Sequence, residues 1–407
     1  MMREDVETDV AVLGLGAMGS AVLYQLARRG VAAIGIDRFA PPHDLGSTHG
    51  GTRITREAIG EGPENVPFVR ESHRIWRELE AATGRTLLVQ CGGIVIGRAG
   101  GTGQFHGRGD FVARTAEVAR QFGIVHEMLA GAEIRRRFPH LIGATDADIA
   151  YYEPGAGYVR PEECVAAQLD QARALGATVL TGIRAVSITQ TGAKVRIETE
   201  SGTITAGRVV VAAGAWAAKL LGAPFNNLLS VTRQAQHWFP LAPTAPLPTD
   251  RPAPAMDFPI FIWAHGTEEA DICYGFPPLP KDGQPGEYWF KSAMGQYDVP
   301  IDPDEAVRTV APAEAAAFYA NHLQGRFAGV LPDAAASTTC LYTVTPDHRF
   351  IIDTHPRIDR VVVISACSGH GFKHSAGIGY AVAARAAGAP SPLDLAPFAL
   401  SRFAVPV

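Results

Sequence analysis

The chain has 407 residues, of which 47% are hydrophobic and 19% are charged, and its formal net charge is −5. Two or three domains are expected, because a chain of this length exceeds what one hydrophobic core usually organises. The mild negative charge argues against nucleic acid or an anionic membrane as a partner, and no apolar run approaches the ~20 residues of a membrane-spanning helix.

Two features of the sequence indicate the cellular compartment of the protein. The first residues, MMREDVETD, lack the apolar core of a signal peptide. The five cysteines are odd in number and form no C-x-x-C pair, which favours a reducing environment over a disulfide framework. We therefore expect a cytoplasmic protein, and the sequence predicts no metal site.

The first predicted elements are a strand, a helix and a second strand. The apolar run 10–13 suits a strand that is buried on both faces, and residues 20–29 predict a helix that ends at Gly30. A second apolar run, 32–36, predicts the next strand.

The turn between the first strand and the helix carries a glycine motif. Gly14, Gly16 and Gly19 fit the pattern G-x-G-x-x-G, which allows a tight turn, a close approach of a pyrophosphate and close packing of the helix on the sheet. Asp37, at the end of the second strand, is placed to accept hydrogen bonds from a ribose. The motif predicts a bound dinucleotide but does not decide between NAD(P) and FAD.

The remaining pattern alternates between helices and strands. Helices are predicted over 66–82, 111–122, 131–138, 161–175, 304–322 and 373–387. Strands are predicted over 87–96, 179–180, 185–189, 194–199, 207–213, 349–353 and 360–364, and residues 231–300 are β-rich. We expect a discontinuous dinucleotide-binding domain of residues 1–88, 150–222 and 335–407, interrupted by a substrate domain of residues 89–149 and 223–334.

Two glycine-containing segments hold polar and cationic side chains that are candidates for a functional site. The loop GSTHGGTRITR, residues 46–56, follows the second strand and packs His49, Arg53 and Arg56 into a short stretch. Its glycines favour a close approach of the backbone to a ligand over a merely solvated basic loop. The segment SGHGFK, residues 368–373, precedes the last predicted helix, whose N-terminus would place positive potential beside a cofactor.

These segments, together with TTCLYTVTPDHRFIID, resemble the family of monomeric sarcosine oxidase and N-methyltryptophan oxidase. The similarity is strongest over 9–60 and 338–380 and weaker over 95–150 and 225–330. It implies an α/β + α+β fold, in which a Rossmann-type FAD-binding domain is interleaved with a β-rich substrate-binding domain. It also implies a monomer that oxidises a secondary-amine amino acid (sarcosine, an N-methyl amino acid or a cyclic imino acid) to an imine, with oxygen reduced to hydrogen peroxide.

The resemblance carries roles for individual residues. Cys340 matches the cysteine that bonds to the flavin 8α-methyl group, and Lys291 matches the lysine that activates oxygen beside flavin N5. The expected catalytic residues are Lys291, His49, Arg53 and Tyr274, and the expected substrate-binding residues are Arg56, Lys373 and Tyr274. The expected cofactor-binding residues are Gly14, Gly16, Gly19, Asp37, Gly46, Ser47, Thr48, His49, Arg53, Gly214, Cys340, Gly369, His370, Gly371 and Lys373.

The sequence departs from the family pattern around the substrate pocket. The spacing from Tyr274 to Lys291 is longer than in the family, which makes Lys281 a rival for the oxygen-activating role. A histidine of the family is replaced by Gly295, and an acid by Gly51. Three alternatives stay open: an FAD dehydrogenase that passes electrons to a carrier, a flavin-binding subunit without turnover of its own, and an NAD(P) dehydrogenase.

Overall fold

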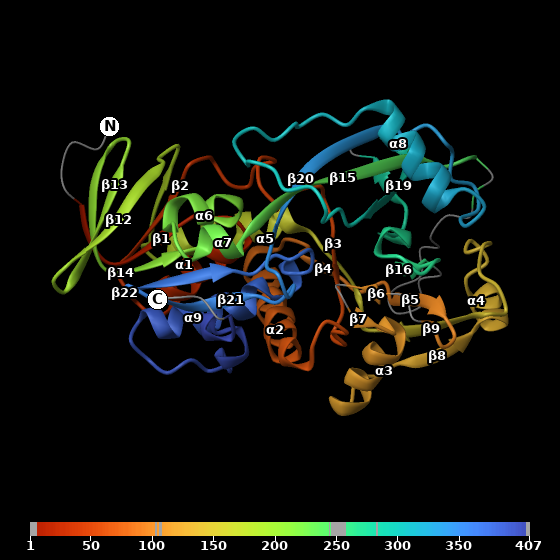
Figure 1. Cartoon of the computed structure of the whole chain (residues 1–407), viewed down its shortest axis with the longest axis horizontal. Helices are drawn as coiled ribbons and strands as arrows, with labels where there is room; N and C mark the ends of the chain where they lie inside the picture. The colour runs from red at the N-terminus through yellow and green to blue at the C-terminus, as the bar shows by residue number, and fades with distance from the viewer. Residues whose placement is uncertain are drawn as a thin grey trace.

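The computed structural model describes residues 6–101, 104–105, 108–243, 245, 258–281 and 284–403. The molecule has two lobes, each built on a twisted sheet, and the long strands β15 and β20 run from one lobe towards the other (Figure 1). Among the described residues, no helix has both the length and the apolar character needed to cross a membrane.

The sheet of the first lobe has a parallel core. Its order is β11-β2-β1-β14, and β22 pairs with the second half of β14. β13 and β12 extend it as an antiparallel ribbon, and β21 pairs with β22. The strands are β1 (Val6–Leu13), β2 (Ala33–Asp37), β11 (Thr178–Thr181), β12 (Ala185–Thr191), β13 (Lys194–Thr199), β14 (Gly202–Val211), β21 (Ile351–His355) and β22 (Ile358–Ser365).

Helices cover both faces of this sheet, as a buried parallel sheet requires. One face packs against a layer that contains α1 (Ala17–Arg28), α2 (Val66–Thr83), α5 (Pro161–Ala174) and α9 (Ser375–Ala386). The other face packs against α6 (Ala217–Leu221) and α7 (Phe225–Leu228). Small residues let α1 and α9 lie close: a Cβ added at Gly379 would stand 2.5 Å from the Cβ of Ala21.

The second lobe is built on a mostly antiparallel sheet of order β20-β15-β19-β17-β16-β5-β9-β8, with β18 beside β19. Its strands are β5 (Gly93–Arg98), β8 (Glu127–Ala130), β9 (Asp148–Glu153), β15 (Ser230–Pro240), β16 (Ile260–Ala264), β17 (Ile272–Gly275), β18 (Leu279–Lys281), β19 (Gln284–Met294) and β20 (Ala336–Val344). α3 (Phe111–Gln121) packs on one face, while α4 (Gly131–Arg137) and α8 (Pro312–Phe318) pack on the other.

Short strands join the lobes. β3 (Arg53–Thr55), β10 (Gly157–Val159) and β4 (Leu88–Val89) form a small antiparallel sheet. A separate short pair, β6 (Gln104–Phe105) with β7 (Arg108–Gly109), lies between β5 and α3 in the chain and belongs to the second lobe.

The predicted fold class is confirmed, and the sheet pairing adds detail to the predicted domain division. β20 and the last four residues of β9 fall in segments assigned from sequence to the dinucleotide-binding domain, yet both strands pair within the sheet of the second lobe. Sequence pattern does not reveal this, because a buried strand looks the same whichever sheet it joins.

The structure confirms only the second half of one predicted helix. The helix expected over 304–322 begins only at Pro312, and a π-helical turn (Tyr319–Leu323) continues it. The preceding segment is held by side chains of other elements instead of helical bonds. Asp304 accepts hydrogen bonds from Arg38, Trp216 and Lys219, and the carbonyl of Val307 accepts one from Arg233.

Candidate active site

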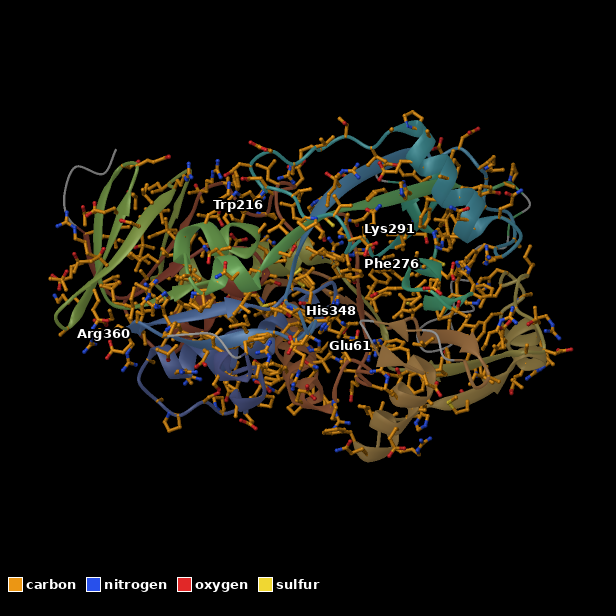
Figure 2. The ribbon with its side chains drawn as sticks, viewed as in Figure 1. Glu61, Trp216, Phe276, Lys291, His348 and Arg360 are labelled. Atoms are coloured by element: carbon orange, nitrogen blue, oxygen red, sulfur yellow. The ribbon has the colours of Figure 1, made fainter. Side chains whose placement is uncertain are left out.

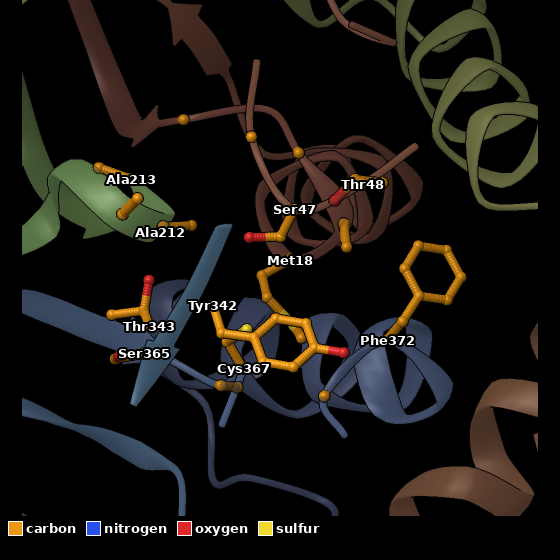
Figure 3. A pocket seen from close by; sticks show the side chains of 18 of the residues that line it. Met18, Ser47, Thr48, Ala212, Ala213, Tyr342, Thr343, Ser365, Cys367 and Phe372 are labelled. Carbon is orange, nitrogen blue, oxygen red and sulfur yellow. The ribbon is translucent and has the colours of Figure 1, made fainter. Parts of the chain in front are cut away.

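A cavity of about 330 Å³ lies between the lobes. Its walls come from both of them: Gly14 follows β1 and Asp37 ends β2, Tyr274 and Phe276 come from β17 and the residues after it, and Lys373 precedes α9. Figure 3 shows small side chains such as Ala212 and Ala213 on one side and Tyr342 and Phe372 on another. The cavity is lined largely by apolar atoms with a few convergent polar groups, which is typical of a cofactor or substrate site.

The predicted glycine motif forms the end of the cavity at β1. Gly14 has a φ of +88° and its N–H donates to the carbonyl of Ile36 at 2.8 Å. A Cβ at Gly19 would stand 1.7 Å from the Gly14 carbonyl oxygen, so only glycine lets α1 pack here. Gly16 precedes the helix without a capping side chain, which leaves the first N–H groups of α1 available to an anion.

Asp37 closes the same end. Its carboxylate accepts hydrogen bonds from the N–H groups of Leu15 and Phe39, both at 2.7 Å. Burial raises the pKa of this carboxyl, and the two backbone bonds oppose the rise. A carboxylate has about four acceptor positions, so capacity remains for the hydroxyl groups of a ribose.

The loop of residues 46–56 is pinned against β20 and its own backbone. The Ser47 hydroxyl donates to the carbonyl of Leu341, and Arg53 donates to the carbonyls of Ser47 at 2.9 Å and Thr52 at 2.8 Å. Burial, with the nearby Arg53, lowers the pKa of His49 to about 4, so its imidazole is neutral. Its Nε2 atom finds no hydrogen-bond partner among the described residues.

Lys291 lies behind this loop and is fully buried. Its Nζ donates to the carbonyls of Gly50 at 2.5 Å and Thr52 at 3.1 Å, and it stands about 5 Å from the ring centres of Trp238 and Phe276. Burial and the positive charge of Arg53 hold the pKa of this ammonium well below its usual value. Figure 2 shows Lys291 beside Phe276, in the region between the lobes.

Glu162, at the start of α5, fixes the other side of the Gly50 peptide. Its carboxylate accepts the N–H groups of Gly50 at 2.6 Å and Gly51 at 3.0 Å. The peptide unit that accepts the bond from Lys291 is thereby attached to the first lobe. Sequence reasoning missed Glu162, because an acid in the first turn of a helix is usual without any further role.

Two cysteines belong to one cluster near the cavity. Cys340, Tyr342 and Val344 share one face of β20, and Cys367 packs against them. Cys367 lies in the cavity wall (Figure 3), whereas Cys340 is 1% exposed and stands behind the described lining residues. Burial raises the pKa of the Cys340 thiol.

Arg56 and Lys373 both line the cavity, and a carboxylate of the chain lies with them. Arg56 forms an ion pair with Glu61 at 2.8 Å, and both side chains are buried. Burial lowers the pKa of Lys373 to about 8, while Glu61 raises it and Arg56 lowers it further. The family resemblance, which assigned Arg56 and Lys373 to substrate binding, gave no indication of Glu61 beside them. An acid inside the apolar stretch AIGEG, only a few residues after Arg56, was the available signal.

Tyrosines complete the end of the cavity near β17. The hydroxyl groups of Tyr274 and Tyr342 are 3.2 Å apart, and the rings of Tyr297 and Tyr342 lie 6.1 Å apart. Gly369 has a φ of +81°, and a Cβ there would stand 2.5 Å from the Tyr297 hydroxyl. Tyr342 and Tyr297 were not among the predicted site residues.

Most of the remaining predicted residues line the cavity, whereas His49 and Lys291 are not among its described lining residues. Gly46, Ser47, Thr48, Gly214, Gly369, His370 and Gly371 line it. The side chain of Lys281, the predicted rival of Lys291, lies outside the described residues; its backbone pairs with Gln284 in the β18–β19 hairpin.

The lining fits a flavin dinucleotide. The glycine cradle and Asp37 suit a diphosphate and a ribose. Further along, the hydroxyl groups of Thr343 and Ser365 are buried without a partner among the described residues, and both line the cavity. Buried polar atoms of this kind are rare without a ligand or water to satisfy them.

Comparisons with known proteins agree with this geometry. The family described as FAD dependent oxidoreductase matches residues 9–385. The chain is 37% identical to the monomeric sarcosine oxidase of Streptomyces avermitilis over 92% of each chain. It is 33% identical to an N-methyl-L-tryptophan oxidase of Yersinia pestis, covering 98% of this chain and 100% of that one. The structure of NikD, an unusual amino acid oxidase, superposes with a TM-score of 0.79 at 24% identity over 97% of each chain.

Proposed function

Because this chain belongs to the FAD dependent oxidoreductase family, we propose that it oxidises the C–N bond of a secondary-amine amino acid. The substrate class comprises sarcosine, other N-methyl amino acids and cyclic imino acids. The products are an imine, which water hydrolyses, and hydrogen peroxide. When bound, FAD supplies the two-electron acceptor: the substrate carbon gives up a hydride, the nitrogen gives up a proton, and oxygen finally takes two electrons and two protons.

The proposed substrate class rests on Arg56 and Lys373, two cationic residues at one end of the cavity. Arg56 and Lys373 are buried in the same wall, and Lys373 is mostly protonated at neutral pH because its pKa is about 8. A guanidinium offers a carboxylate two parallel hydrogen bonds, and an ammonium adds a third. In this structure the Arg56 guanidinium is paired with the Glu61 carboxylate, so a substrate carboxylate would compete with Glu61 for the guanidinium. A subunit that only stores a flavin would have no use for such a pair.

Lys291 is our candidate for the group that favours oxygen as the electron acceptor. When this buried amine carries a proton, it would stabilise negative charge that develops on oxygen far more than a solvated ammonium would. Its contacts with the Gly50 and Thr52 carbonyls hold it at the loop that carries His49 and Arg53. The alternative, a dehydrogenase that uses a carrier, would show little peroxide formation.

We also propose that Cys340 holds the flavin covalently. Its neighbours in the cluster, Tyr342 and Cys367, line the cavity, which puts the thiol within one side-chain layer of the site. Intact mass spectrometry of the wild-type chain and of Cys340→Ala tests this, with Cys367→Ser as the matched control. A yellow wild-type protein with the mass of the bare chain would overturn the proposal.

A monomer in the cytoplasm is the expected state.

The decisive experiment compares amino acids with amines that lack the carboxylate. Purified protein is mixed with sarcosine, N-methyl amino acids, proline and pipecolate, and with the decarboxylated analogue of each. Peroxide release and bleaching of the flavin absorbance are followed. We expect the acids to react and the analogues to be poor substrates. Equal rates for an acid and its analogue would contradict the carboxylate clamp, and bleaching without peroxide would favour the dehydrogenase.

A further inference from the structure

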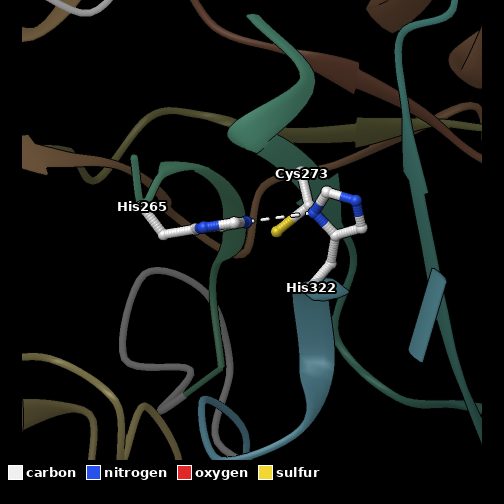
Figure 4. Close-up of side chains that lie close together, drawn as sticks. All are labelled: His265, Cys273 and His322. Atoms are coloured by element: carbon white, nitrogen blue, oxygen red, sulfur yellow. Dashed lines mark hydrogen bonds between the residues drawn. The ribbon is translucent and has the colours of Figure 1, made fainter. Parts of the chain in front are cut away.

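Three ligand-forming side chains meet in the second lobe, on the far side of the sheet from the cavity. They are His265, which follows β16, Cys273 in β17, and His322 in the π-helical turn after α8 (Figure 4). Their ligand atoms all lie within 4.8 Å of one another. His265 Nε2 and His322 Nδ1 are 3.0 Å apart.

We propose that His265, Cys273 and His322 form a zinc site that fastens the π-helical turn to the β16–β17 hairpin. Two imidazoles and a thiolate are ligands that Zn²⁺ prefers, and a water molecule would complete the tetrahedron. In such a site the ligand atoms are separated by roughly 3.3–3.6 Å, as follows from bond lengths of about 2.0–2.3 Å. The three side chains therefore need only small movements to close around an ion.

The hairpin accounts for two of the three ligands. Trp263 of β16 pairs directly with Cys273, so their side chains share one face, and His265 lies two residues beyond Trp263 on that same face. The N–H of His265 donates to the carbonyl of Asp271 at 3.1 Å, which closes the turn of the hairpin. His265 and Cys273 are thus diagonal neighbours by register.

The third ligand comes from an unusual stretch of helix. The N–H of Gln324 donates to the carbonyl of Tyr319, five residues back, at 2.9 Å. Such wider turns are rare and are frequently found at functional sites. Here the turn brings His322 over the hairpin, and the residue is 4% exposed.

The charges at the site permit an ion. The packing brings a ring nitrogen of each imidazole to the site, and a neutral imidazole offers such a nitrogen to a metal. Arg326 and Asp271 lie near both rings, so one cation and one anion of the chain face the site. The thiol loses its proton when it becomes a ligand, so each Zn²⁺ bound releases one proton and leaves a net charge of +1 on the metal and its ligands.

The proposed zinc site lies on the opposite face of β17 from the cavity. Successive side chains of a strand alternate between faces, so Cys273 faces the zinc site while Ile272 and Tyr274 face the cavity. A bound ion would hold β17 in place from behind. It takes no part in the proposed amine oxidation, and its presence or absence can be tested independently of turnover.

The test uses the tag-free flavin-loaded protein, equilibrated with ZnCl₂ and then dialysed against a weak chelator. We expect about one zinc per chain by elemental analysis, and a melting temperature at least ~2 °C above that of the chelator-stripped protein. His265→Ala, at the half-exposed ligand, should lose the zinc and the temperature shift while keeping its flavin. His126→Ala and Cys164→Ser, which change a histidine and a cysteine elsewhere, should keep both.

A cobalt experiment tests the cysteine separately. Co²⁺ added to the stripped protein should give a near-ultraviolet thiolate-to-metal band in wild type and in Cys164→Ser, and none in Cys273→Ser. No zinc in the wild type, equal zinc in His265→Ala, or cobalt bound without a thiolate band would each overturn the proposal. The three residues would then be a hydrogen-bonded histidine pair beside a core cysteine.

Discussion

The two ends of the cavity are built by different means. At the β1 end the chain offers backbone: the turn at Gly14, the open N-terminus of α1 and one carboxylate, Asp37, bound to N–H groups. At the β17 end it offers buried charged side chains, Arg56, Glu61 and Lys373, brought together from distant segments. Backbone sites bind through shape and fixed dipoles, whereas buried side-chain charges respond to pH and to one another. The first end therefore suits a permanent cofactor, and the second suits a substrate that comes and goes.

The largest expected effect comes from disturbing the backbone end. Gly19→Val should abolish FAD retention, because any Cβ at this position would overlap the Gly14 carbonyl oxygen. Flavin content per chain and the melting temperature measure it. Gly155→Ala is the matched control, since a Cβ there meets its nearest atom at 3.9 Å. A Gly19 variant with full flavin content would show that the turn is not needed for the cofactor.

The next effect should separate the two half-reactions. Lys291→Met removes a buried amino group that donates to the Gly50 and Thr52 carbonyls, and we expect reoxidation by oxygen to slow by about 10²-fold or more. Anaerobic reduction by substrate should change far less. Stopped-flow absorbance of both half-reactions measures this, with Lys194→Met, at an exposed lysine away from the cavity, as control. Equal slowing of both half-reactions would mean that the variant damages the site as a whole.

Substitutions of Arg56 and Glu61 should have smaller effects on carboxylate binding, and the opposite directions of these effects should distinguish the roles of the two residues. Arg56→Met should raise the substrate concentration for half-reduction by roughly 10- to 100-fold, since a charge-assisted hydrogen bond contributes about 1.5–3 kcal/mol. Glu61→Gln should do the opposite and tighten the binding of simple carboxylates, because it removes the internal competitor for Arg56. Inhibition constants for acetate and related acids measure both changes. Weaker carboxylate binding in Glu61→Gln would mean that Glu61 positions Arg56 instead of competing for it.

The smallest effect is a pH dependence. The pKa of Lys373 lies below its usual value, at about 8, so the ammonium is charged below that pH and loses its proton above it. Carboxylate inhibitors should bind most tightly below pH 8, and their affinity should fall as the pH rises through that value. Lys373→Met should remove this inflection, and Lys373→Arg should move it beyond the measurable range. An unchanged inflection in Lys373→Met would assign it to another group.

The sequence by itself determined the elements and motifs that depend on local rules. The glycine motif, the helix ending at Gly30 and Asp37 are close neighbours in the chain, so their spacing alone predicts a strand, a turn, a helix and an anion-binding end. The family resemblance located Arg56, Lys373 and Tyr274, and the structure brings all three to one cavity. Whether they perform the predicted roles stays a prediction.

Only the tertiary structure decided the partners of those residues. Glu61 beside Arg56, Glu162 beneath the Gly50 peptide and the meeting of Cys273 with His322 depend on which elements pack together. The same holds for β20, which joins the sheet of the second lobe, and for residues 304–311, which other side chains hold out of a helix. Burial, and with it the lowered pKa of Lys373, is a property of the packed molecule. A local pattern fixes the conformation of nearby residues, but contacts between distant residues arise from the free energy of the whole packing.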